Sequence, residues 1–256
     1  MFERFPEGFQ ALIQGASRGI GLECVRQLLD EPRVGRVFAT ARRPARAADL
    51  QALAEAHPDR LVTVALDVTD ESSIEDAAAA VAARTDRLHL LFNVAGLLHD
   101  SDGMRPEKRI ADVRLENLEK SFRVNAWGPL LVVKAFERLL LHREHAVVAN
   151  LSARVGSIGD NGLGGWYAYR GAKAAQNMFT RGLAVEFARR APSTLCVALH
   201  PGTTDTGLSA PFQARVPEGK LFSTAFTAER LLANIAAVDA QSSGSFIAWD
   251  GTPIPW

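Results

Sequence analysis

A tyrosine and a lysine stand four residues apart, at the two ends of the run YRGAK from Tyr169 to Lys173. Positions i and i+4 of a helix share a face, so the phenol and the ammonium would lie together. A free tyrosine is a poor base at neutral pH, and a neighbouring positive charge lowers its pKa. Such a pair can exchange a proton with a substrate oxygen. The alternative is an exposed pair without chemistry, and Tyr167 has no lysine four residues on.

A glycine-rich turn precedes the first helical pattern of the chain. Glycines let the backbone turn sharply and approach a bound group without a Cβ, and the start of a helix favours an anion. The turn can therefore hold the pyrophosphate of a dinucleotide, and the alternative is a turn without a ligand. A nicotinamide dinucleotide would supply a hydride, and Lys173 can hold its ribose hydroxyls. The turn residues expected at the cofactor are Gly15, Ser17, Arg18, Gly19, Ile20 and Gly21.

Two further strand candidates end in residues that suit an adenosine group. Asp67 can accept a hydrogen bond from the adenine amino group, and the Val68 amide can pair with the ring. Asp67 is equally well explained as an acid ahead of the next helix. Asn93, Ala95 and Gly96 end the other strand, where small residues let the backbone lie against the ribose. Parallel α/β sheets bind ligands at this carboxyl edge.

The end of the second strand candidate distinguishes the two nicotinamide cofactors. NAD-binding sites of this kind usually place an acid there, to hold the ribose 2′-hydroxyl. This chain has the run Thr40–Arg43 instead, in which Arg42 can bind a 2′-phosphate as a charged fork. Arg18 can approach the same group. The alternative is a pair of solvated loop arginines, and the missing acid favours NADP (NADPH) over NAD.

Two other features belong to the same edge of the sheet. Asn125 interrupts a helical pattern that its poor helix propensity should break, with its side chain bound to backbone or water. Pro201 and Gly202 form a turn after a strand candidate. The segment that follows includes Thr204 and Thr206, and it can close over the nicotinamide carboxamide and a phosphate.

Short apolar runs alternate with longer helical patterns along the whole chain, which predicts parallel pairing with helical crossovers. We expect an α/β fold: one doubly wound Rossmann domain over residues 1–256, with about seven parallel strands and helices on both faces. The expected strands are Gln10–Gln14, Arg36–Ala41, Leu61–Leu66, Leu88–Asn93, Ala146–Leu151, Leu195–His200 and Ser245–Trp249. The expected helices are Gly19–Leu29, Arg46–Ala56, Glu71–Ala83, Leu115–Leu141 with a break, Tyr167–Arg190 and Ala228–Val238.

The composition excludes several other classes of protein. Lys plus Arg equals Asp plus Glu, at 29 each, so nothing favours nucleic acid or an acidic membrane surface. The two cysteines and the six histidines show no metal-ligand spacing, and we expect no metal site. His142 and His145, the only close pair, lie in a predicted surface turn. The chain shows no membrane span and no secretory signal, which predicts a soluble, cytoplasmic protein.

Taken together, these residues resemble those of the short-chain dehydrogenase/reductase superfamily, and the likeness runs the length of the chain. The segments Asn150–Ile158, Gly164–Arg170 and Trp249–Trp256 resemble its C-factor and sniffer-like carbonyl reductase branch. The resemblance implies that Tyr169 is the catalytic acid/base and Lys173 its electrostatic partner. It further implies that Asn125 anchors a water-linked proton relay.

The chain departs from the superfamily pattern at three places. Gln14 replaces a threonine before the glycine turn, and Phe92 replaces an asparagine; both look tolerable. The third departure is more serious, because the serine that orients the carbonyl should stand three residues before Gly156, at Ala153. Ser152 is one residue away, and a small change in loop path can bring it into the catalytic role. Ser157 is a weaker candidate, since it reads as a loop residue that caps backbone groups.

These residues are compatible with two functions of different class. The first is an NADPH-dependent oxidoreductase that reduces a ketone or aldehyde, or runs in reverse on an alcohol. The second is a dinucleotide-binding signalling or interaction protein of C-factor type, with weak or no turnover, which the missing serine motivates. The apolar circumference of the two longest helices predicts a homo-oligomer, with a dimer favoured over a tetramer.

Overall fold

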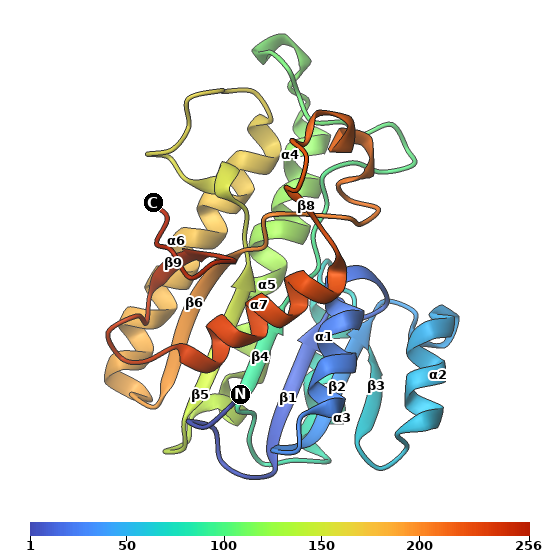
Figure 1. The fold of residues 1–256 in the computed structure, drawn as a ribbon, viewed down its shortest axis with the longest axis vertical. Helices are drawn as coiled ribbons and strands as arrows, with labels where there is room; N and C mark the ends of the chain where they lie inside the picture. The colour runs from blue at the N-terminus through green and yellow to red at the C-terminus, as the bar shows by residue number, and fades with distance from the viewer.

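The computed structural model describes residues 1–256 as a single α/β domain built on a seven-stranded parallel sheet (Figure 1). The strand order is β3-β2-β1-β4-β5-β6-β9, so the chain moves outward from β1 and then returns to β1's other side with β4. Parallel sheets bind ligands at the carboxyl edge beside such a reversal. The strands are β1 Phe9–Gln14, β2 Val34–Ala41, β3 Leu61–Ala65, β4 Leu90–Asn93, β5 Ala146–Leu151, β6 Thr194–His200 and β9 Ser245–Ala248.

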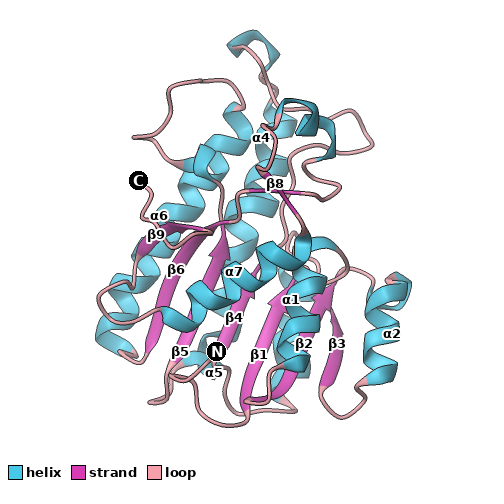
Figure 2. Cartoon of the chain, viewed as in Figure 1, coloured by secondary structure: helices cyan, strands magenta, loops and turns pink.

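Helices cover both faces of this sheet, as the alternating pattern predicts (Figure 2). One apolar core joins one face of the sheet to α1, α2 and α7, and a second joins the other face to α3, α5 and α6. The central strands β1 and β4 are buried on both faces, which explains their continuous apolar runs. The helices are α1 Gly19–Asp30, α2 Ala48–Ala56, α3 Glu71–Ala82, α4 Leu115–Phe122, α5 Gly128–Leu140, α6 Tyr167–Arg190 and α7 Thr224–Ala237.

The expected break near Asn125 is present as a π-helical turn over Arg123–Trp127, which separates α4 from α5. Gly128 follows it, where a Cβ would approach both Arg123 O and Val68 O to 2.8 Å. A glycine is therefore needed where the two helices meet over Val68. The break also brings Asn125 to the end of the sheet at which β4 and β5 finish.

Two smaller features were not predicted. A two-stranded parallel sheet pairs β7 Thr203–Thr204 with β8 Leu221–Phe222 above the carboxyl edge. Farther along the chain, Pro253 pairs antiparallel with Ile247 of β9, and Ile254 is buried against that strand. None of the helices combines the length and the apolar character that crossing a membrane requires.

Candidate cofactor and active site

The glycine turn lies between β1 and α1 at the carboxyl edge of the sheet. Gly15 has a φ of +88°, and a Cβ there would come within 2.7 Å of Ala95 N. Gly21 packs against the carbonyl of Gly15, where a side chain would collide. The first turn of α1 has neither a capping side chain nor an acidic residue. Its N–H groups and its dipole are therefore open to an anion, as a pyrophosphate site requires.

Arg18 and Arg42 are both exposed beside this turn, and neither takes part in an ion pair within the chain. Arg42 directly follows the last residue of β2, and no carboxylate stands at that strand end. Two unpaired guanidinium groups near one strand end suit the second phosphate of NADP.

The structure distinguishes the two explanations of Asp67. The N-terminal acid that caps α3 is Asp70, which accepts from the N–H groups of Ser72 and Ser73. Asp67 instead accepts from the N–H and the hydroxyl of Thr69, at 2.9 and 2.7 Å, through one carboxylate oxygen. Its second oxygen has no partner within the chain, and neither has the Val68 N–H. The pairing expected for an adenine edge therefore stays open.

The Asn93 side chain is turned into the protein. Its Nδ2 donates to Asn150 Oδ1 at 2.8 Å and to Pro129 O at 3.3 Å, and the residue is buried. Its side chain therefore serves the fold, and only its backbone is left for a ligand. Ala95 is held by Gln14, whose Oε1 accepts its N–H at 3.1 Å. This bond gives a structural role to a residue that departs from the family pattern, and a strand-end glutamine carries no signal for it.

Tyr169 and Lys173 lie together on α6, as their spacing predicts. Both are buried, and Lys173 Nζ stands 5.8 Å from the centre of the Tyr169 ring. Nζ donates to the carbonyl of Leu151 at 2.7 Å and to Gln176 Oε1 at 3.0 Å. Burial raises the pKa of Tyr169 above its ordinary value and lowers the pKa of Lys173 to about 7. In the chain alone, desolvation thus outweighs the lowering of the tyrosine pKa that the pairing suggests.

Asn125 reaches this pair through hydrogen bonds. Its side chain donates to Leu97 O at 2.8 Å and accepts from Leu97 N at 2.9 Å, which is the backbone pairing expected of it. Its Nδ2 also donates to Ser121 Oγ at 3.1 Å, and Ser121 donates to the carbonyl of Ala168, beside Tyr169. Ser121 is buried, and the sequence offered no signal for it beyond its place one turn before Asn125.

Glu107 holds the start of α6 from a distant loop. Its carbonyl accepts the N–H of Trp166 at 2.6 Å, and its Oε2 accepts the N–H of Ala168 at 3.2 Å. Trp166 itself has a left-handed φ of +53°, which is unusual for a large side chain and typical of sites held by their surroundings. Glu107 was also missed, because its partners lie some sixty positions along the chain.

The structure gives the Ser152 hydroxyl, predicted as a catalytic donor, a partner within the fold. Its hydroxyl is buried and donates to Asn177 Oδ1 at 2.6 Å. Asn177 lies eight residues after Tyr169 on α6, about 12 Å along the helix axis. Successive residues of extended backbone point to opposite faces, so Ala153, which is partly exposed, faces away from Asn177. The one-residue shift therefore directs the Ser152 hydroxyl to Asn177, two helical turns beyond Tyr169.

Ser157 does not replace the missing donor either. Its hydroxyl donates to the carbonyl of Pro255, and it accepts the N–H of Asp160 at 3.1 Å. This is the backbone-capping role that its loop position predicts. His200 lies close behind this loop; its Nδ1 accepts the N–H of Arg154, and burial lowers its pKa to about 4.

The segment after β6 covers the site. Gly202 turns with a φ of +73°, and a Cβ there would press on Phe222 and Trp249. Thr204 is buried and pairs with the hydroxyl of Thr227 of α7 at 2.9 Å, which serves the fold. The methyl of Thr206 stands 3.5 Å from the position of a Cβ on Gly19 and so reaches the glycine turn.

An aromatic row continues from the same segment to the tyrosine. The ring of Phe212 packs 5.1 Å from that of Trp166, which lies edge-on to Tyr169 at 6.4 Å between centroids. His99 completes the row at 6.1 Å from Phe212, and its Nε2 binds the carbonyls of Gly207 and Leu208. The segment is thereby fixed both to the glycine turn and to the start of α6.

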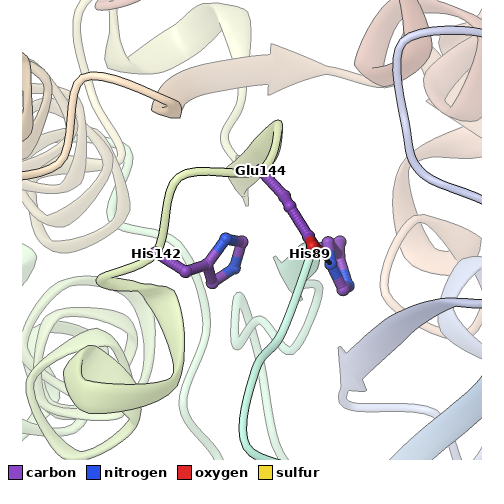
Figure 3. A group of neighbouring side chains, drawn as sticks. All are labelled: His89, His142 and Glu144. Atoms are coloured by element: carbon purple, nitrogen blue, oxygen red, sulfur yellow. Dashed lines mark hydrogen bonds and ion pairs between the residues drawn. The ribbon is translucent and has the colours of Figure 1, made fainter.

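A second group of titratable side chains lies at the opposite edge of the sheet and consists of His89, His142 and Glu144 (Figure 3). His89 Nδ1 accepts the backbone N–H of Gln10 at 3.0 Å, so the ring proton sits on Nε2, which donates to Glu144 at 2.7 Å. A metal on Nε2 would require an imidazolate, and Arg87 already pairs with the same carboxylate. The donor set of this group does not suit a metal ion.

Comparison with known proteins agrees with this geometry. Residues 10–216 match the family described as short chain dehydrogenase. An NADPH-bound carbonyl reductase from chicken fatty liver superposes with a TM-score of 0.86 at 32% identity, over 99% of this chain and 97% of that one. The carbonyl reductase Sniffer of Drosophila melanogaster gives a TM-score of 0.85 at 27% identity, over 98% of this chain and all of its own.

Two sequence relatives extend the comparison. An uncharacterized oxidoreductase of Schizosaccharomyces pombe is 32% identical over 254 residues, 95% of this chain and 96% of that protein. The C-signal protein of Myxococcus xanthus is 33% identical over 147 residues, 57% of this chain and 83% of its own length. The resemblance to both the sniffer-like reductases and the C-factor proteins is thereby confirmed. The chain, with its glycine turn, its Tyr169–Lys173 helix and its seven-stranded sheet, belongs to the short-chain dehydrogenase family of oxidoreductases.

Proposed function

We propose that this oxidoreductase uses NADPH to reduce the carbonyl group of a small ketone or aldehyde, and that it can oxidise the matching alcohol in reverse. The observation that carries the proposal is the pair of buried side chains Tyr169 and Lys173, with Nζ 5.8 Å from the phenol ring, at the carboxyl edge of the sheet. The bound nicotinamide supplies or accepts the hydride. Tyr169 donates the proton to the carbonyl oxygen in reduction and accepts it in oxidation.

Burial favours the form of Tyr169 that reduction needs. A neutral phenol is a proton donor, and desolvation keeps its pKa high. Once the proton has left, the resulting phenolate is stabilised by the ammonium of Lys173, whose first role is to hold the ribose of the cofactor beside it. Glu107 and Ser121 keep the start of α6, and with it the phenol, in place through Ala168.

The choice of NADPH rests on the chain's own arginines. Arg42 stands where an acid would be needed for NADH, and neither it nor Arg18 is paired with a carboxylate. The chicken reductase of similar fold was solved with NADPH bound. The Asp67 carboxylate and the Val68 N–H would hold the adenine, and the open start of α1 would hold the pyrophosphate.

A second function has one specific observation in its favour. Ala153 occupies the position from which a hydroxyl would steady the substrate oxygen, and neither Ser152 nor Ser157 replaces it. Losing one preorganised donor costs about 10²–10³ in rate. A dinucleotide-binding protein that signals or assembles, with little turnover, would tolerate that loss, and the similarity to C-signal supports this alternative.

One assay separates the two functions. NADPH oxidation is followed at 340 nm across dicarbonyls, quinones, aromatic ketones and aldehydes, with NADPH binding measured in parallel by calorimetry. The proposal predicts turnover that disappears in Tyr169→Phe while binding persists. Tight binding of NADPH without oxidation of any substrate would favour the second function, and absence of binding would overturn both.

We further propose that the protein forms a homodimer through α4, α5 and α6. Exposed apolar residues stand on α4 at Leu115 and on α6 at Met178 and Val185, of which Met178 is 68% and Val185 48% exposed. Burying such a face against a second copy would remove it from water. Light scattering at micromolar concentration tests this, and a mass of 27.7 kDa would contradict it.

A further inference from the structure

Gln176 is buried beside Lys173, and neither the fold nor the proposed chemistry has so far given it a role. It lies three residues after Lys173 on α6, with 1% of its surface exposed. Its Oε1 accepts a hydrogen bond from Lys173 Nζ at 3.0 Å. Its Nε2 has no partner at all, although the atom is buried.

The direction of this amide follows from chemistry. A lysine ammonium has three N–H donors and no acceptor, so only the oxygen of Gln176 can face it. The amide nitrogen is thereby left unsatisfied inside the protein, which costs stability. A leucine of similar size would fill the same space without an orphaned donor. Fold stability alone therefore does not account for a glutamine here, and the contact with Lys173 does.

We propose that Gln176 is a positioning residue for the Tyr169–Lys173 pair: its oxygen and the carbonyl of Leu151 together hold two of the three N–H bonds of Lys173 and direct the third to the cofactor and the tyrosine. The distances are 3.0 and 2.7 Å. With both acceptors in place, the long lysine side chain is confined to one direction. This inference rests on the proposed function, since it assigns a role within the same reaction.

The surroundings of Lys173 make these two oxygens important. No charged group contributes to lowering its pKa to about 7; burial alone is the cause. On α6, the titratable group that lies beside Lys173 is Tyr169. The turn after β5 brings Arg154, which pairs at the surface with Asp160, and β6 brings His200, which burial keeps neutral. Because no carboxylate lies near Lys173, the neutral oxygens of Gln176 and Leu151 are the groups that stabilise its ammonium form.

The first experiment measures the titration midpoint of the Lys173 ammonium directly, in the chain without cofactor. The protein has five lysines, so ¹³C labelling at Cε gives few signals, and Lys173→Arg assigns the one in question. We expect Gln176→Leu to lower the titration midpoint of Lys173, because an acceptor is lost. Gln176→Glu places a carboxylate against the ammonium and should raise the midpoint by about one unit or more.

A matched control comes from the next residue. Asn177 is also a buried amide on α6, but it bonds to Ser152 and to the carbonyl of Gly156 instead of Lys173. Asn177→Ala should lower the melting temperature and leave the Lys173 midpoint unchanged. Midpoints that are the same in wild type, Gln176→Leu and Gln176→Glu, or that move in one direction in both variants, would overturn the proposal.

The second experiment reads the same effect in turnover. Reduction needs Lys173 protonated, so kcat falls as pH rises through its pKa in the complex. The alkaline limb of the kcat profile should move to lower pH in Gln176→Leu and to higher pH in Gln176→Glu. Asn177→Ala should change only the magnitude of kcat and not the pH at which it falls. If the wild type shows no turnover, the proposed function fails, but the midpoints measured without cofactor still decide the role of Gln176.

Discussion

The two edges of the sheet carry titratable groups that differ in how far their charges are paired within the chain. At the amino edge, both ring nitrogens of His89 are bonded within the chain, and Glu144 accepts from His89 and Arg87, although one ring nitrogen of His142 and one of His145 are buried without a partner. At the carboxyl edge, Arg42 has no ion-pair partner and the start of α1 has no capping side chain. Lys173 uses two of its three N–H bonds within the chain, which leaves the third free. Buried charge by itself therefore does not identify a functional site. Hydrogen-bonding groups that have no partner and lie beside a glycine turn are the better indication of such a site.

The strongest test of this comparison removes the phenol hydroxyl. Tyr169→Phe should lower kcat by about 10³ or more, because general acid catalysis typically contributes 10²–10⁴. The ring keeps its packing, so the dissociation constant for NADPH should change little. Stopped-flow oxidation of NADPH and calorimetry measure the two quantities. A variant that retained more than a few per cent of the rate would place proton transfer elsewhere.

The unpaired arginine at the carboxyl edge provides the next test. Arg42→Ala should weaken NADPH binding by about ten- to a hundredfold, the worth of one bidentate charged contact, and should leave NADH binding unchanged. Arg143→Ala, an exposed arginine near the amino edge, is the matched control and should affect neither cofactor. Equal losses for NADPH and NADH would remove the 2′-phosphate from the explanation.

Because Ala153 stands where the superfamily carries a serine, restoring that serine is expected to raise activity. In Ala153→Ser, a hydroxyl appears on the side of the strand end that faces away from Asn177, and kcat should rise by about tenfold, within the effect of one preorganised donor. Ser152→Ala should lower stability by roughly 1 kcal/mol, since it loses a buried hydrogen bond, and leave kcat intact. A sharp fall of kcat in Ser152→Ala would restore Ser152 as the catalytic donor.

The smallest effect is expected at the amino edge and concerns acid stability. Burial holds the pKa of His89 below its ordinary value of 6.5, and the same cause lowers that of His145. Between the depressed pKa and 6.5, the unfolded chain binds more protons, so the free energy of unfolding falls as pH drops below 6.5. Chemical denaturation from pH 7.5 to 5 should show this slope, and His89→Gln should reduce it.

The matching kinetic experiment uses the same variant. His89→Gln can still accept from Gln10 N–H and donate to Glu144, so the fold should survive and kcat should not change. A loss of kcat in His89→Gln would contradict the contrast between a structural and a functional edge.

What the sequence predicted depends on how local its signals are. The glycine turn, the Tyr169–Lys173 spacing and the break at Asn125 are encoded within a few residues, and each lies where its pattern indicates. Glu107 and Gln176 were missed because their roles arise only from partners brought close by folding. The hydrogen bond of Ser152 to Asn177 was not predicted, because a one-residue offset at a strand end decides which face a side chain occupies and spacing alone cannot fix that direction.

The π-helical turn at Arg123–Trp127 also constrains which insertions and deletions the chain can accept. Each residue of a regular helix turns the chain by about 100°, since 3.6 residues make one turn. Deleting one residue within the π turn would allow α4 and α5 to fuse into an unbroken helix of normal winding. Because the wide turn absorbs one extra residue locally, the fused helix would keep Val132 and Phe136 in the second core but lose the turn that holds Asn125 against Leu97. A deletion there should therefore leave the packing of α5 intact and act first on the position of Asn125.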